Sequence, residues 1–423
     1  MGLKEKLYSK NGKFATNTIF LFMLTFSNYL FNFITFPYQT RILGKEIFGN
    51  IGFATSVMTY FQLVMEFGFL LSATEDIAKN REDKKKVSEI FTSVMCCKVL
   101  LVAVCFAVLS VLCGFVDRFR SDPLLFILYF AAYAVFAFIP DYLYRGIENM
   151  KAITVRSVLI KMFSTVMIFI FLKDASQYYL VPVFTGIGNL GAVIFVMLHV
   201  YKLGYGFVRI KPSDVLYSFR RSAYYFFSRI ASAVHTATNT VILGFIFGEG
   251  SGLVGLYSTA EKGIAVAKQA ITPVTDSLYP YMVKNRDFRL VKKLLMLGMP
   301  VLFIGCTVVM IIANPLCAFV FGEEYYGAGD YLRLLAPVVF FSFPATMFGF
   351  PVLTPMGLAK HANRSVIIGA VLQLTMIAVI HFTAGITPER ICIATCITEI
   401  FTCLYRVAVV YKNRHLMKES TED

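Results

Sequence analysis

Long apolar runs recur from one end of the chain to the other, and they restrict what it can fold into. Twelve stretches of about 20 residues or more are mostly apolar and end at charged or turn-forming residues. A helix of this length spans the hydrocarbon core of a bilayer. The sequence therefore predicts an all-α integral membrane protein with twelve transmembrane helices. The predicted spans are residues 15–40, 47–72, 88–114, 123–144, 153–172, 178–201, 219–246, 253–280, 294–315, 331–356, 364–383 and 389–411.

The basic residues are distributed unevenly between the two sides of the predicted membrane. With 57% hydrophobic and 16% charged residues, the chain is too apolar for an ordinary soluble domain. If the spans alternate in direction, 27 of the 40 Lys and Arg residues fall on the side of the termini and six on the other. Such an excess is typical of cytoplasmic loops. We therefore predict cytoplasmic termini, and the net charge of +14 needs no nucleic acid partner to explain it.

Similar residues recur at about half the length of the chain. Two pairs of glycines have offsets of 206 and 211 residues, which favours an internal duplication. Six spans per copy predict two six-helix lobes related by a pseudo-twofold axis along the membrane normal, with substrate between them. We place the N-lobe at 1–201, a cytoplasmic linker at 202–218 and the C-lobe at 219–423. The recurring residues are Gly49 with Ala54 and Gly255 with Ala260, then Pro140 with Gly146 and Pro351 with Gly357.

Six ionisable residues lie at membrane depth in the seventh and eighth spans. Each would cost about 2.5 kcal/mol or more in the bilayer centre, so together they indicate a water-filled cavity and a charged cargo. Arg229 and Lys268 lie deepest and are the predicted anion ligands. Lys98 and Lys161 could line the cavity or snorkel, whereas Arg406 should snorkel. The six residues are Arg229, His235, Glu261, Lys262, Lys268 and Asp276.

Polar side chains form a stripe on the first span and another on the seventh. Their helical spacing places them on one face of otherwise apolar helices. They could line the cavity, or they could hydrogen-bond neighbouring helices. The stripes include Asn28, Asn32, Thr35 and Gln39 on the first span, and Thr236, Asn239 and Thr240 on the seventh.

Five acidic residues within or beside the spans are candidates for ion coupling. A buried carboxylate can exchange a proton or Na⁺ when its surroundings change, and a structural salt bridge is the alternative. These candidates are Glu66, Asp141, Glu261, Asp276 and Glu399.

The sequence offers no pattern for a metal, a cofactor or a nucleotide. All nine cysteines fall in apolar segments without metal-ligand spacing, so we interpret them as packing residues. A phosphate-binding GxxxxGK[ST] loop is absent. Pro337, Pro344 and Pro351 recur along one face of the tenth span and predict either a static kink or a moving gate.

Several segments in order resemble the bacterial polysaccharide-repeat flippases, which are the O-antigen and capsular oligosaccharide transporters. The first is residues 36–49 (FPYQTRILGKEIFG) and the second is residues 140–151 (PDYLYRGIENMK). Residues 254–262 (VGLYSTAEK) and 269–274 (QAITPV) are similar to the eighth span of that family. Tyr142 departs from the second motif, where Trp would be expected.

This resemblance implies a transporter of the multidrug/oligosaccharidyl-lipid/polysaccharide exporter fold rather than an enzyme. Its cargo would be an undecaprenyl-diphosphate-linked oligosaccharide, flipped to the outer leaflet of the bacterial inner membrane. Membrane lipid and a polysaccharide polymerase machinery would be its partners. A buried basic cluster suits this diphosphate, and we assign it to Arg229, Lys268, Lys262 and Arg41.

Two other functions remain open at this stage. A cation-coupled multidrug exporter of the same fold would favour an acidic cavity, which the basic cluster argues against. A membrane polysaccharide polymerase or glycosyltransferase should carry a large outward catalytic loop. The longest predicted outward loop, residues 316–330, is short.

Overall fold

The computed structural model describes the backbone of residues 10–417. The chain divides into two compact units. Unit 1 contains the residues up to Leu43 and Ala54–Ile230, and unit 2 contains Gly44–Phe53 and the residues from Ala231 onward. Side chains are described throughout this range except those of residues 10–19, 21, 22, 28, 29, 32, 227, 228, 232, 236, 280, 284 and 417.

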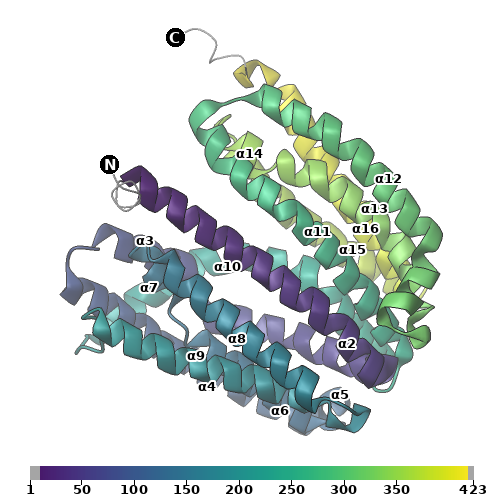
Figure 1. Ribbon diagram of the computed structural model, residues 1–423, viewed down its shortest axis with the longest axis horizontal. Coiled ribbons are helices and arrows are strands. Elements are labelled where there is room, and N and C mark those ends of the chain that lie inside the picture. Colours follow the sequence, from purple (N-terminus) through teal and green to yellow (C-terminus); the bar gives the residue numbers. More distant parts are fainter. Residues whose placement is uncertain (1–9, 418–423) are drawn as a thin grey trace. The chain divides into compact units, whose positions relative to one another are not determined.

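Unit 1 is built from long helices that run beside one another (Figure 1). The helix α9 packs against α6 and α8, and the short helices α3 and α7 pack together. Buried aromatic residues, including Phe69, Phe91, Tyr142 and Tyr144, form its core. The helices are α2 (Lys10–Glu66) apart from Gly44–Phe53, α3 (Phe69–Lys79), α4 (Lys84–Phe115), α5 (Asp117–Arg120), α6 (Pro123–Ala137), α7 (Asp141–Gly146), α8 (Met150–Phe171), η1 (Ala175–Gln177), α9 (Leu180–Lys202) and the first part of α10 (Pro212–Phe247).

Local sequence signals explain where several helices begin and break. Asp83, Asp122 and Asn149 each accept a backbone N–H at the start of a helix, which satisfies a donor that the helix itself leaves free. Gly44 has φ 69° and interrupts α2. Gly68 has φ 79° and separates α2 from α3. Glycine adopts this left-handed region without the steric cost of a Cβ atom.

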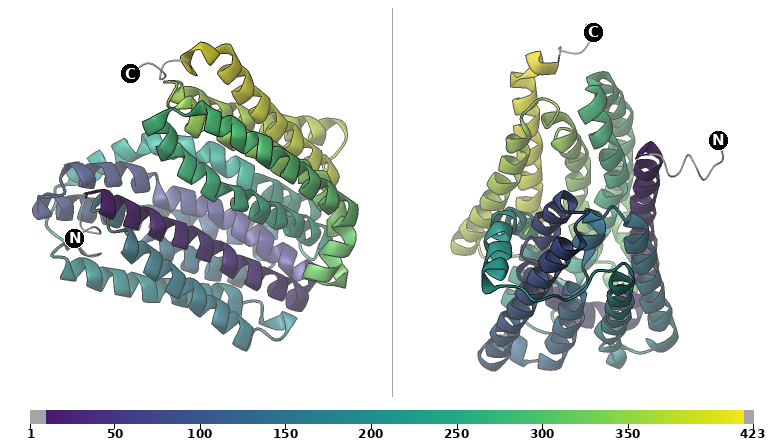
Figure 2. Two further views of the ribbon diagram at one scale, coloured as in Figure 1. Left: turned by 45° about the horizontal axis from the view of Figure 1, so that its top comes forward. Right: turned by 90° about the vertical axis from the view of Figure 1, so that its left-hand side faces the viewer.

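Unit 2 is centred on α13, which packs against α11, α12 and α16. Figure 2 shows these helices running along one another, with α15 against α16 on the side away from α12. The helices are α11 (Gly252–Asn285), α12 (Phe288–Phe321), η2 (Glu323–Tyr325), α13 (Ala328–Met347), α14 (Phe350–Leu353), α15 (Ala359–Thr383), α16 (Pro388–Lys412) and η3 (Arg414–Met417).

Two glycines that the sequence repeat matches with each other touch in unit 2. A Cβ atom on Gly49 would lie 2.8 Å from the backbone nitrogen of Gly255. A Cβ atom on Gly255 would lie 1.8 Å from the carbonyl oxygen of Lys45. The segment Gly44–Phe53 therefore packs backbone to backbone on the start of α11. Such close approach of helices is typical of small residues in membranes.

The prediction of an all-α membrane protein is confirmed, and each predicted span overlaps a described helix. Within residues 10–417, nine helical segments are long and apolar enough to cross a membrane. The number rises to ten if the bent pair Arg229–His235 and Ala237–Phe247 forms one span. The count of twelve and the twofold symmetry stay predictions. The compact units also differ from the predicted lobes, because Gly44–Phe53 joins the second unit and residues 202–230 join the first.

Candidate functional site

Arg229, one of the predicted anion ligands in unit 1, is already held by a carboxylate. Arg229 Nη1 lies 2.8 Å from Glu66 Oε2, and the two side chains are 35% and 18% exposed. Gln62 Nε2 donates to the other oxygen of Glu66 at 2.9 Å. The pair joins α10 to the last turns of α2. An incoming anion that binds Nη1 of Arg229 must therefore displace Glu66.

Unit 2 contains a similar pair. Lys268 Nζ lies 3.2 Å from Glu399 Oε2, with exposed fractions of 38% and 19%. Ser342 Oγ donates to Glu399 Oε1 at 2.5 Å, so α11, α13 and α16 meet at this carboxylate. The sequence had assigned Lys268 to the diphosphate and Glu399 to ion coupling. In each unit, the structure thus joins one predicted anion ligand to one predicted coupling carboxylate.

Asn239 belongs to a buried hydrogen-bond network in unit 2. Its amide nitrogen donates to Tyr257 Oη and to Thr395 Oγ1, each at 3.0 Å. Its amide oxygen accepts from Gln373 Nε2 at 3.0 Å, and the residue is only 2% exposed. This geometry favours the alternative that Asn239 holds helices together. Sequence reasoning missed Gln373, although a glutamine in the middle of an apolar run was a usable signal.

Glu261 continues the same network. Thr240 Oγ1 donates to Glu261 Oε2 at 2.6 Å, and Tyr257 Oη donates to Oε1 at 3.4 Å. The ammonium group of the adjacent Lys262 lies 4.2 Å from the centroid of the Phe48 ring, within the range of a cation–π interaction. Two hydroxyl donors therefore hold the Glu261 carboxylate inside the helix packing.

The other stripe and loop candidates are divided between the two units. Thr35 Oγ1 hydrogen-bonds Thr165 Oγ1 at 3.1 Å, which ties α2 to α8. Gln39 is half-buried, whereas Arg41 and Asp276 are exposed. Since Arg41 and Arg229 belong to unit 1 and Lys262 and Lys268 to unit 2, a shared diphosphate site stays a prediction. The side chains of Asn28, Asn32 and Thr236 lie outside the described residues.

Asp141 forms a salt bridge with Arg156. Its two carboxylate oxygens accept from Arg156 Nη1 at 2.5 Å and from Nη2 at 3.2 Å. The Arg156 side chain is only 3% exposed. A bidentate pair of this kind orients both partners strongly. The geometry favours the structural alternative for Asp141 over ion coupling.

Two buried cations satisfy carbonyl groups near helix ends. Lys98 on α4 donates to the carbonyl of Ala137 and, at 3.5 Å, to that of Ile139, where α6 has ended before Pro140. Arg406 on α16 donates to the carbonyl of Ala345 at 2.6 Å, near the end of α13. Arg406 is 8% exposed, so it does not snorkel as predicted. Both residues supply donors to carbonyls that a helix end leaves unpaired.

Comparison with known proteins places the chain in a family. A family model described as polysaccharide biosynthesis protein matches residues 14–286. The chain belongs to this family. An Escherichia coli K12 relative named "Putative O-antigen transporter" is 27% identical over 368 residues, covering 85% of this chain and 88% of the relative. A Shigella dysenteriae relative of the same name is 26% identical, covering 85% and 90%.

Solved structures show the same fold at low sequence identity. The lipid II flippase MurJ, in an inward closed conformation, matches with a TM-score of 0.75 and 12% identity, over 93% of this chain and 87% of that chain. A multidrug resistance MATE family transporter of the MOP superfamily matches with a TM-score of 0.70 and 14% identity, over 93% and 96%. The chain is accordingly a multi-pass membrane protein of the polysaccharide biosynthesis family, with the fold of these solved structures.

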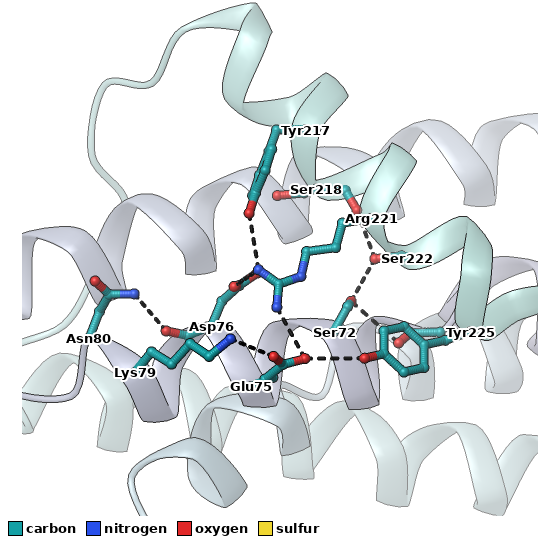
Figure 3. A network of polar contacts seen from close by, with 11 residues as sticks. Ser72, Glu75, Asp76, Lys79, Asn80, Tyr217, Ser218, Arg221, Ser222 and Tyr225 are labelled. Carbon is teal, nitrogen blue, oxygen red and sulfur yellow. Dashed lines mark hydrogen bonds and ion pairs between the residues drawn. The ribbon is translucent and has the colours of Figure 1, made fainter.

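A polar network joins α3 to the first part of α10 (Figure 3). Arg221 forms ion pairs with Asp76 and, at 3.1 Å, with Glu75. Tyr225 Oη donates to Glu75 at 3.1 Å, and the hydroxyls of Ser72 and Ser222 are 2.7 Å apart. The sequence did not indicate Arg221 as a site residue. Its ion pairs connect the start of α10 to α3 within unit 1.

We expect Arg221→Ala to weaken the attachment of α10 to α3. The change removes both ion pairs and leaves Asp76, whose side chain is 16% exposed, without its main cationic partner. The expected loss of stability is about 1–2 kcal/mol, measured as a lower melting temperature in detergent. Lys79→Ala is the matched control, because Lys79 pairs with Glu75 at a 63% exposed position and its loss should leave the melting temperature unchanged. Equal effects of both changes would contradict this role for Arg221.

Proposed function

We propose that this membrane protein is a flippase for undecaprenyl-diphosphate-linked oligosaccharide repeat units. It moves them from the cytoplasmic to the outer leaflet of the bacterial inner membrane, for O-antigen, capsule or exopolysaccharide synthesis. The observation that carries the proposal is the pair of half-buried ion pairs, Arg229–Glu66 and Lys268–Glu399. Each places a cation that can bind a phosphate oxygen within the helix packing.

The exchange of one anion for another makes such a site physically reasonable. An unpaired cation at membrane depth is costly, and its own carboxylate removes this cost while the site is empty. A diphosphate that takes over the cation leaves the net charge around it nearly balanced. The freed Glu66 or Glu399 then faces desolvation as an anion, which favours uptake of a proton or Na⁺. Cargo binding and ion coupling would thus share the same two carboxylates.

The remaining predicted residues have different parts in this proposal. Lys262 and Arg41 would contact the diphosphate at a later stage of alternating access. Asn239 and Thr240 are closed into the buried network, so they would reach sugar only after it opens. The first-span stripe is the other candidate to contact sugar. Positive charge on the predicted loops supports cytoplasmic termini in this arrangement.

Deletion of the gene in its source bacterium tests the proposal against its rivals. A mutant that lacks a flippase should lose surface polysaccharide and accumulate single lipid-linked repeat units. In intact spheroplasts, a membrane-impermeant reagent that labels glycans should not reach these units. Labelled units on the outer leaflet would instead indicate a polymerase and would refute the proposal. Unchanged polysaccharide with increased drug sensitivity would indicate a multidrug exporter. Loss of the lipid-linked unit itself would indicate a glycosyltransferase.

A further inference from the structure

Lys161 lies in the middle of the apolar helix α8, between Met150 and Phe171. Its side chain is half-buried. No hydrogen bond or ion pair of Lys161 is found within the part of the chain that the structure describes. A lysine at this depth without a partner is costly unless it contacts water or an anion.

The side chain does not lie on the face of α8 that is most exposed to the surroundings. At 100° per residue, the exposed residues Leu159, Met162 and Val166 lie roughly 100–160° around the helix from Lys161. Thr154 and Thr165 lie within about 40° of it on the same scale. The structure therefore places Lys161 on the inner side of this helix, and snorkelling toward lipid is not favoured.

The two threonines show which helix this inner face meets. Thr154 Oγ1 donates to the carbonyl of Phe20 at 2.8 Å, and Thr165 bonds Thr35 at 3.1 Å. Both partners lie on α2, so Lys161 is located between two fixed contacts with that helix. The segment of α2 between Phe20 and Thr35 is also the one that carries most of the predicted polar stripe. Lys161 thus stands beside the helix to which we assign sugar contact.

Three other buried or half-buried cations of unit 1 already have partners. Lys98 is bound to the carbonyls of Ala137 and Ile139, Arg156 to Asp141, and Arg229 to Glu66. Lys161 differs because an anion can bind it without displacing a protein group. Its half-buried side chain is therefore available before either ion pair has to open.

We propose that Lys161 is the first contact of the cargo's diphosphate in unit 1. The inference rests on the proposed function and adds a residue to it. The lysine binds a phosphate oxygen as a point charge, which needs no fixed geometry and suits an early, loosely held state. The later exchange at Arg229 then begins from a cargo that is already inside the protein.

Binding of farnesyl diphosphate to the purified full chain in phosphatidylcholine nanodiscs tests this inference, with farnesol as the uncharged probe. We expect Lys161→Met to weaken diphosphate binding about tenfold and Lys161→Arg to stay within about threefold of wild type. Farnesol binding should not change. The melting temperature of each variant verifies folding, and Lys161→Gln serves as a second neutral variant.

The other outcomes are equally decisive. If wild type and Lys161→Met bind the diphosphate equally while the paired change Arg229→Met with Glu66→Gln weakens binding, the role of Lys161 is refuted and the proposed function stands. If the wild type does not prefer the diphosphate over farnesol, both fail. If phosphatidylglycerol in the nanodisc removes the difference between wild type and Lys161→Met, the lysine binds phospholipid headgroups, which also overturns the inference.

Discussion

Neutralising both ion pairs together is expected to abolish flipping and leave the protein folded. The variant combines Arg229→Met with Glu66→Gln and Lys268→Met with Glu399→Gln. Changing both partners avoids an uncompensated buried charge, which would destabilise the fold by about 3–5 kcal/mol. With Arg229 and Lys268 neutral, the diphosphate loses the two cations of these ion pairs, and surface polysaccharide should fall at least about 100-fold. Glycan output and protein level in the membrane are measured in the deletion strain.

Reversed pairs provide the matched control for this experiment. Arg229→Glu with Glu66→Arg keeps an ion pair at the same place and exchanges its two ends. If the site needs only a nearby cation, this variant should recover part of the output, whereas the neutral variant should recover none. Wild-type polysaccharide from the fully neutral variant would overturn the assignment of Arg229 and Lys268. A large loss of protein from the membrane would show that the pairs are mainly structural.

Hydropathy predicted the helices well because the length and apolar character of each run are local properties of the sequence. The runs at 88–114 and 389–411 correspond closely to α4 (Lys84–Phe115) and α16 (Pro388–Lys412). Packing between distant segments carries no such local signal. The packing of Gly44–Phe53 with the second unit could not be read from hydropathy, since the segment belongs to the first repeat in sequence. The repeat did identify the glycines that make this packing possible.

The sequence predicted the charged residues of the site better than their partners. Arg229 and Glu66 are separated by 163 residues, and Lys268 and Glu399 by 131, so no spacing rule joins them. The sequence also underestimated the burial of a cation that has a backbone carbonyl as its partner. Arg406 is near the end of its span, yet it points into the protein because the carbonyl of Ala345 needs a donor. Such backbone acceptors are invisible until helix ends are placed in three dimensions.

Replacing Gly255 by leucine is expected to be the most damaging single change for folding. Even the first carbon of the new side chain would lie 1.8 Å from the carbonyl oxygen of Lys45, far inside van der Waals contact. Neither backbone can yield alone, because a Cβ atom on Gly49 would itself lie 2.8 Å from the backbone nitrogen of Gly255. We expect a loss of about 3 kcal/mol or more, measured as loss of the monodisperse peak in size-exclusion chromatography after mild heating.

Gly263 on the same helix gives the matched control. A Cβ atom there would meet only Leu332 Cδ1, at 3.8 Å, which is ordinary van der Waals contact. Gly263→Ala should therefore be neutral or stabilise α11 by about 0.5–1 kcal/mol through its higher helix propensity. If Gly255→Leu instead gave a normal chromatographic profile together with wild-type transport, the close packing of Gly44–Phe53 on α11 would be refuted. If that variant folds normally but transports nothing, the contact opens during the cycle and the glycines serve movement more than folding.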